Sequence, residues 1–196
     1  MARHAPEGLV SETAPLREIV AALDAQAVPH MLAGSFASTH HGVPRTTHDI
    51  DLVIDPTAAA LERFVEGLDP ERFYVSPEAA REAWRRRGQF NVVDLETGWK
   101  VDLILCKDRP FSHEEFRRRQ PATLLGAKVF VATAEDTVLA KLEWARLGES
   151  ERQLRDVVGI LQMQGTRLDR LYIERWAAEL GVEMLWQRAR SEAGLV

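Results

Sequence analysis

The sequence predicts an α+β fold followed by a helical extension. In the first two thirds of the chain, short apolar runs typical of strands alternate with amphipathic stretches that have helical periodicity. After Thr133 no strand pattern returns, and helical stretches follow one another with single glycines between them. We therefore expect two domains, an α+β domain over residues 1–132 and a helical domain over residues 133–196.

The elements of the first domain follow from local signals. An apolar stripe that begins at Leu16 predicts the first helix, and Gly42 and Pro44 end a short second one. Pro56 and Thr57 are typical of a helix start. Helices are expected over 13–27, 35–41, 57–68 and 77–87 and in a short basic stretch after Pro110. Strands are expected over 30–33, 49–55, 89–95, 99–105 and 127–131, with 89–105 forming a hairpin.

In the second domain, Thr133 and Asp136 resemble a capping box at the start of the first helix. Helices are expected near 134–147, 150–163, 168–180 and 182–193. Trp144, Trp176 and Trp186 fall on helical stripes, which predicts that they are core residues.

Composition limits the class of protein. The 196 residues carry a net charge of −5, with 45% hydrophobic and 28% charged residues, as in an ordinary globular protein. This balance argues against nonspecific coating of nucleic acid. No apolar run approaches the roughly 20 residues that span a bilayer. The first ten residues lack a basic region followed by an apolar stretch, so we do not expect export. A single cysteine, Cys106, fits a reducing compartment, so we expect a cytoplasmic protein without a membrane partner.

Three acidic residues lie within apolar strands. Asp49 and Asp51 are two residues apart, so their side chains leave the same face of the strand roughly 6.5–7 Å apart. Asp102 lies in the run Val101–Leu105 and joins them if the two strands are neighbours. Such a cluster costs stability unless cations neutralise it, and Mg²⁺ ions holding a nucleotide triphosphate suit it. Asp94 is a rival third ligand.

A turn before the first acidic pair predicts phosphate binding. Gly34 allows close approach of backbone N–H groups to a ligand, and Ser35 can cap the helix that follows. A helix N-terminus favours phosphate oxygens. Arg45 and Thr47 directly precede the strand that begins at Asp49. An arginine at this place can bind phosphate oxygens in a bidentate way, or it can simply form part of the turn after Pro44.

The segment LAGSFASTHHGVPRTTHDIDLVI resembles the signature of the nucleotidyltransferase superfamily: apolar-Gly-Gly/Ser, about ten residues, then apolar-Asp-apolar-Asp/Glu. The resemblance covers roughly the first 105 residues and implies a polymerase-β-like fold, a small mixed sheet flanked by helices. It implies that Asp49 and Asp51 hold Mg²⁺ and that Asp102 completes the catalytic site.

The activity implied is transfer of a nucleoside monophosphate from an NTP, ATP first among them, to a hydroxyl acceptor with release of pyrophosphate. Two Mg²⁺ ions, or Mn²⁺ in their place, are the implied cofactors. The acceptor stays open between a small molecule, a protein and a tRNA end. A catalytically inactive nucleotide-binding regulatory module is the alternative from a different class.

The helical extension is partly similar to the AbiEii-type toxin nucleotidyltransferases. That resemblance implies site roles for Lys141, Arg155 and Asp156, with Lys141 reaching the triphosphate as a point charge. It also raises the alternative of a toxin that modifies tRNA and has an antitoxin partner. The match is partial, because the second acid of the pattern is replaced here by Gly159.

Two arginine triplets, 85–87 and 117–119, interrupt a chain that is acidic overall. Such runs are usually solvated helix faces. The alternative is a track for RNA or a nucleotide acceptor, with Trp84 available for stacking.

Overall fold

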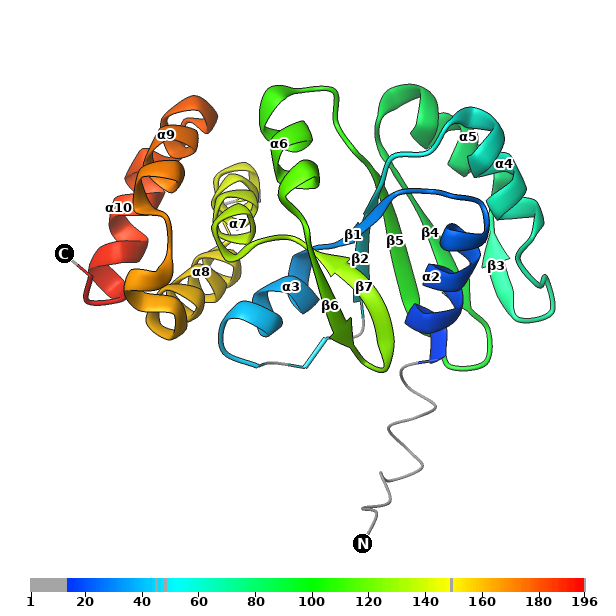
Figure 1. Cartoon of the computed structure of the whole chain (residues 1–196), viewed down its shortest axis with the longest axis horizontal. Coiled ribbons are helices and arrows are strands. Elements are labelled where there is room, and N and C mark those ends of the chain that lie inside the picture. Colours follow the sequence, from blue (N-terminus) through cyan, green and yellow to red (C-terminus); the bar gives the residue numbers. More distant parts are fainter. Residues whose placement is uncertain (1–13, 45, 48, 149, 196) are drawn as a thin grey trace, which may run out of the picture. The chain divides into compact units, whose positions relative to one another are not determined.

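The computed structural model describes residues 14–44, 46–47, 49–148 and 150–195. The chain forms two compact units (Figure 1). The first takes in the described residues within 1–32 and 48–131, and the second takes in those within 33–47 and 132–196. The division into two domains at residue 132 stays a prediction. The two compact units do not follow it throughout, because residues 33–47 group with the C-terminal helices.

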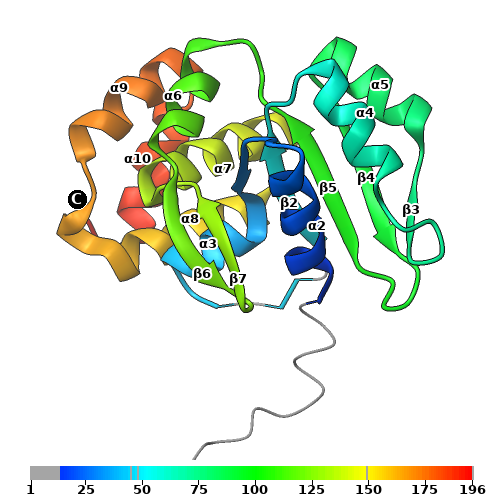
Figure 2. The ribbon, with the colours of Figure 1, turned by 45° about the vertical axis from the view of Figure 1, so that its right-hand side comes forward.

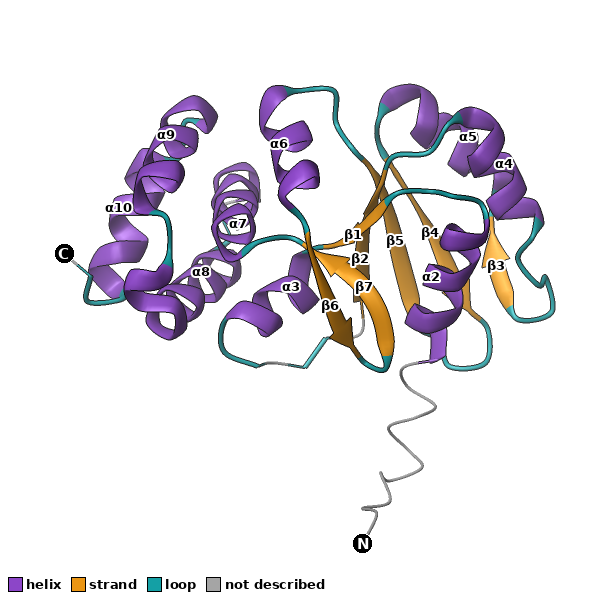
Figure 3. Cartoon of the chain, in the orientation of Figure 1, coloured by secondary structure: helices purple, strands orange, loops and turns teal. Residues whose placement is uncertain are grey.

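The first unit is built on a mixed sheet. Within the described residues, seven strands pair in the order β3-β4-β5-β2-β1-β7-β6 (Figure 3). The strands β2 and β5 are parallel, as are β1 and β7, and the remaining neighbours are antiparallel. The strands are β1 (His30–Leu32), β2 (Asp49–Ile54), β3 (Phe73–Val75), β4 (Gln89–Asp94), β5 (Lys100–Leu105), β6 (Gln120–Leu124) and β7 (Ala127–Val131).

The two faces of the central strands differ in burial. On β2, Ile50, Leu52 and Ile54 are fully buried, whereas Asp49 and Asp51 alternate with them on the more exposed face. Burial of the apolar face fixes the register, because a slip of one residue would move the aspartates into the core.

Among its described residues this unit has the helices α2 (Ala14–Ala25), α4 (Ala58–Glu66), α5 (Pro77–Arg86) and α6 (Pro110–Arg118). Helices α4 and α5 pack against each other, and α5 also contacts β4 and β5 (Figure 2). The side chains of Thr57 and Ser76 cap α4 and α5 by accepting hydrogen bonds from backbone N–H groups. Trp84 donates its indole N–H to the carbonyl of Pro56 and so ties α5 to the segment that precedes α4.

In the second unit, the regular elements among the described residues are all helices, joined by loops (Figure 3). Its elements are α3 (Gly34–His41), α7 (Ala134–Gly148), α8 (Glu151–Gln164), the 3₁₀ turn η1 (Gly165–Arg167), α9 (Arg170–Leu180) and α10 (Glu183–Glu192). Helix α3 packs on α7 and α8. One half of the predicted capping box at α7 is present, because the Thr133 hydroxyl accepts from Asp136 N at 3.2 Å. The Asp136 carboxylate accepts from the Thr133 hydroxyl at 2.6 Å, where a full capping box would have it accept from the backbone N–H.

The α+β class is confirmed, and the expected helices and strands are present with bounds that differ by a few residues. Strands β3 and β6 were not expected. The prediction that Trp144 is a core residue is wrong, since 52% of it is exposed, whereas Trp176 and Trp186 are buried. Among the described residues, no helix has both the length and the apolarity needed to cross a membrane.

Candidate active site

Asp51 and Asp102 are direct neighbours in the sheet. The parallel pairing of β2 and β5 places Asp51 opposite Asp102 and Asp49 opposite Lys100. Residues that are paired in register leave the same face, and so do residues two apart on one strand. The three predicted acidic residues therefore share one face of the first unit, as the sequence indicated. Asp49 is exposed, Asp51 is half-buried and Asp102 is buried.

Lys100 lies on the same face and was missed by the sequence analysis. Its ammonium donates to Oδ2 of Asp102 at 2.9 Å, and 41% of the lysine side chain is exposed. The hydrogen bond to Asp102 raises the pKa of the Lys100 ammonium above its ordinary value. The negative charges of Asp49 and Asp51 add to this rise, so the ammonium senses all three carboxylates.

The chemistry of this face suits a divalent cation. Carboxylate oxygens are the hard ligands that Mg²⁺ prefers, and the Lys100 ammonium shows that the face already attracts a cation. Within the described part of the chain, no three acidic, histidine or cysteine side chains are grouped closely enough to hold a metal ion.

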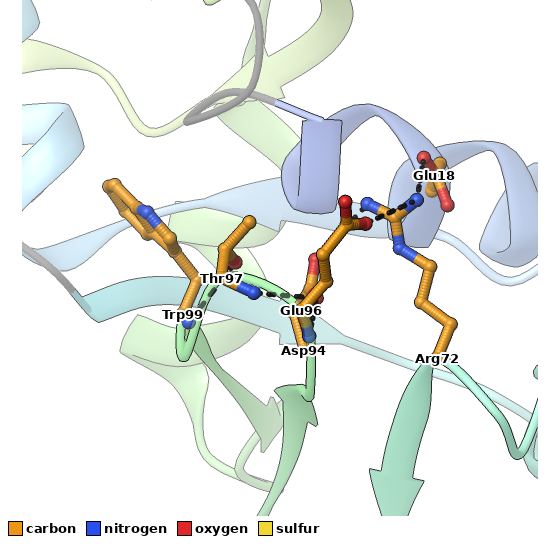
Figure 4. Close-up of polar contacts among 6 residues, drawn as sticks. All are labelled: Glu18, Arg72, Asp94, Glu96, Thr97 and Trp99. Atoms are coloured by element: carbon orange, nitrogen blue, oxygen red, sulfur yellow. Dashed lines mark hydrogen bonds and ion pairs between the residues drawn. The ribbon is translucent and has the colours of Figure 1, made fainter. Parts of the chain in front are cut away.

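Asp94, the rival third ligand, belongs to a different cluster (Figure 4). Its carboxylate is fully buried and accepts from the Arg72 guanidinium at 3.2 Å. Its other oxygen accepts from the backbone N–H groups of Glu96 and Thr97, which closes the hairpin turn. On β4, Asn91 is paired with Asp102 and shares its face of the sheet. Asp94 lies three residues further along the same strand, so its side chain leaves the opposite face from Asp102.

Arg72 completes this cluster. Its guanidinium lies 3.3 Å from Glu18 on α2 and 3.5 Å from Glu96, as Figure 4 shows. The cluster therefore joins α2 to the turn between β4 and β5. Because β5 begins directly after this turn, the cluster holds the start of the strand that carries Lys100 and Asp102.

Asn91 is a second residue that the sequence analysis did not single out. It is exposed on β4 and paired in register with Asp102, so the polar face continues onto a third strand. Only the strand register could have found it, because an asparagine in an alternating strand has no local signature of function.

The described members of the predicted phosphate-binding set all lie in the second unit. Gly34 begins α3 with a φ of +56°, a conformation that favours glycine. The residue at the N-cap is Ala33, so the expectation that Ser35 caps the helix is wrong. Thr47 is half-buried in the loop that precedes β2. Arg45 lies outside the described residues.

Lys141 and Asp156 form a buried ion pair within the second unit. The Lys141 ammonium donates to Asp156 Oδ2 at 2.7 Å and to Gln153 Oε1 at 2.9 Å, which joins α7 to α8. The side chains of Lys141 and Asp156 are only 5% and 10% exposed. This contact accounts for both residues structurally, and their nucleotide-binding role stays a prediction.

Gly159 has a packing reason for its identity. A Cβ built at this position would lie 3.3 Å from Cγ2 of Val43. An acidic side chain here, as the toxin pattern requires, would displace Val43. The glycine that departs from the toxin pattern is therefore the residue of α8 on which Val43 packs closely.

The arginine triplets are largely engaged in local contacts. Arg85 and Arg86 pair with Glu82 on their own helix, and Arg87 donates to Asp55 at 2.8 Å. The Arg119 guanidinium lies over two phenylalanine rings, Phe116 at 4.2 Å and Phe130 at 5.1 Å. These contacts are typical of helix-surface and packing roles, and the RNA track stays a prediction.

Comparison with solved structures identifies the fold. The solution structure of the antibiotic-resistance factor ANT(2'')-Ia matches with a TM-score of 0.59 and 16% identity, over 92% of this chain and 97% of that one. The crystal structure of ANT(2'')-Ia in complex with adenylyl-2''-tobramycin gives a TM-score of 0.56 and 16% identity, over 89% and 99% of the two chains. The fold is that of a nucleotidyltransferase.

A third structure agrees. An antigenic nucleotidyltransferase-like protein from Paracoccidioides brasiliensis matches with a TM-score of 0.53 and 15% identity, over 98% of this chain and 94% of that one. No protein-family model matches the sequence, and no curated protein matches it either. The superfamily resemblance read from the Gly-Ser turn and the Asp49–Asp51 motif is thus confirmed at the level of the fold.

Proposed function

We propose that this protein transfers a nucleoside monophosphate from an NTP to a hydroxyl group. The observation that carries the proposal is the register of β2 and β5, which puts Asp51 beside Asp102 and on the same face as Asp49, in a nucleotidyltransferase fold. Lys100 offsets one of the three negative charges, so the face keeps a net negative charge that costs stability unless a further cation binds.

Each carboxylate has a proposed role. Asp49, Asp51 and Asp102 would hold two divalent cations, and Asp102 also orients the acceptor and takes its hydroxyl proton. When bound, Mg²⁺ neutralises charge on the triphosphate and lowers the pKa of the acceptor hydroxyl. The acceptor oxygen forms a bond to the α-phosphorus while the bond from that phosphorus to the bridging oxygen breaks, and pyrophosphate leaves.

The remaining predicted residues complete the proposal. Gly34 and Ser35 are proposed to bind the triphosphate through the N-terminus of α3, since N–H groups there favour anions. Thr47, Arg45 and Lys141 are proposed as further nucleotide ligands. ATP is the proposed donor, because the matched ANT(2'')-Ia structure holds an adenylylated aminoglycoside.

The experiment is a transfer assay with each of the four NTPs labelled at the α-phosphate. Acceptors offered in parallel are tobramycin, total tRNA and a cell extract, and pyrophosphate release is measured alongside. Label on an acceptor together with pyrophosphate release supports the proposal. NTP binding without either would indicate the regulatory module instead, and label on tRNA alone would favour the toxin alternative.

A further inference from the structure

One cation already occupies the carboxylate face, and it belongs to the chain itself. Lys100 and Asp102 are two residues apart on β5, so the lysine stem runs along the strand and its ammonium meets Asp102 at 2.9 Å. The register places Lys100 directly opposite Asp49 and places Asp102 opposite Asp51. The four groups therefore form two adjacent pairs on one face, three negative and one positive.

We propose that Lys100 is a built-in counter-cation that a divalent metal must displace from Asp102. The inference rests on the proposed function and adds a control on metal entry. The Asp102 side chain is mostly buried, with 13% exposed, so its carboxylate needs a partner when no metal is bound. Lys100 supplies that partner through its 2.9 Å contact with Asp102.

The swap has a physical cost that limits metal affinity. For Asp102 to turn toward a divalent cation, its hydrogen bond to Lys100 must break. The Lys100 ammonium and the metal ion would then repel each other if both stayed on this face. Because 41% of the Lys100 side chain is exposed, the ammonium can swing into solvent, so the cost is modest. Lys100 thus lowers affinity for the bare metal while it relieves repulsion in the metal-free protein.

The test measures binding of Mn²⁺ alone, without nucleotide or turnover. Mn²⁺ is titrated by calorimetry or electron paramagnetic resonance into the wild type and the Lys100→Met variant. We expect Lys100→Met to bind Mn²⁺ roughly two- to tenfold more tightly, since a surface-accessible competing charge is removed. Lys100→Arg keeps the charge and should stay near the wild-type affinity. Lys128→Met removes an exposed lysine from β7 of the same sheet and is the matched control, expected to change nothing.

A second readout separates this role from a merely structural one. Without Mn²⁺, Lys100→Met should melt at a lower temperature than the wild type, because the carboxylates repel one another. Saturating Mn²⁺ should then raise its melting temperature by more than it raises that of the wild type.

The failure of this inference is distinguishable from failure of the proposed function. Unchanged or weaker Mn²⁺ binding in Lys100→Met overturns the displacement model, and the proposed function still stands if Asp51→Asn weakens Mn²⁺ binding. If Asp51→Asn and Asp102→Asn both bind Mn²⁺ as the wild type does, the carboxylate face is not the metal site and both proposals fall.

Discussion

Asp51 on β2 and Asp102 on β5 occupy the same register position of a parallel strand pair, although 51 residues separate them in sequence. Their neighbours on each strand are fully buried or nearly so, which leaves no freedom for either strand to slip. The relationship is therefore a fixed property of the core and does not depend on a flexible loop.

The first prediction concerns Asp94, whose carboxylate serves Arg72 and two turn N–H groups. Asp94→Ala should lower the free energy of unfolding by about 2 kcal/mol or more, since it leaves these donors without their buried acceptor. Asp94→Asn should cost less, because its amide oxygen can still close the turn. Urea denaturation measures both.

The matched control is Glu96→Gln. Glu96 also pairs with Arg72, at 3.5 Å, but 70% of its side chain is exposed, so its loss should change stability little. Equal effects at positions 94 and 96 would show that the buried carboxylate does not hold the turn.

Local sequence patterns were sufficient for part of the site. Strand periodicity alone placed Asp49 and Asp51 on one face, because the apolar residues that alternate with them had to be buried. The position of Asp102 beside them required the register of two distant strands. Lys100 and Asn91 were missed for the same reason: each is an ordinary polar residue until pairing brings it beside an aspartate.

The elements that were missed are short or locally contradictory. Strand β3 has only three residues, too few for a periodic signal, and β6 contains Pro121, which argues against a strand. The grouping of residues 33–47 with the second unit rests on long-range packing, such as Gln164 Nε2 donating to the carbonyl of His41 at 2.6 Å. No local pattern encodes such a contact.

The second prediction concerns the buried ion pair between α7 and α8. Lys141→Ala should destabilise the protein by about 3 kcal/mol or more, since it leaves the Asp156 carboxylate buried without its cation. The double variant Lys141→Met with Asp156→Leu should recover most of that loss, because two apolar groups need no partner. A double variant as unstable as Lys141→Ala would contradict this account, and thermal melts of the three proteins decide it.

The third prediction concerns Gly42 at the end of α3. A Cβ at this position would lie 2.9 Å from the backbone nitrogen of Ile160 on α8. Gly42→Ala should therefore cost about 1–3 kcal/mol through overpacking. The control is Gly148→Ala on α7, where a Cβ meets open space and alanine favours the helix. Chemical denaturation should show opposite signs for the two variants, and matching signs would refute the packing argument.

The fourth prediction is a pH dependence of stability. Burial lowers the pKa of His41 below its ordinary value, and this outweighs the hydrogen bond from its Nε2 to the carbonyl of Ala132 at 2.7 Å. The unfolded chain takes up a proton near pH 6.5, at about the ordinary histidine pKa, whereas His41 in the folded protein takes up its proton only at a lower pH. The stabilisation is thus complete above that pH and is lost as the pH falls toward the folded pKa.

Melting temperatures measured at about pH 7.5 and pH 5.5 test this sign. The wild type should lose more stability between the two values than His41→Gln, which has no group to titrate there. An identical pH dependence in both proteins would assign the effect to other groups.

The most direct measurement of the central claim compares nucleotide transfer by Asp51→Asn, Asp102→Asn and Asp94→Asn, each confirmed as folded by its melting curve. We expect the first two variants to lose transfer by about a hundredfold or more. Asp51→Asn should be at least as stable as the wild type, because a repelling charge is removed, whereas Asp102→Asn also loses its ion pair with Lys100. Asp94→Asn should retain activity within a few-fold, because its side chain leaves the opposite face of the sheet. Transfer by Asp51→Asn or Asp102→Asn at the wild-type rate would contradict the account.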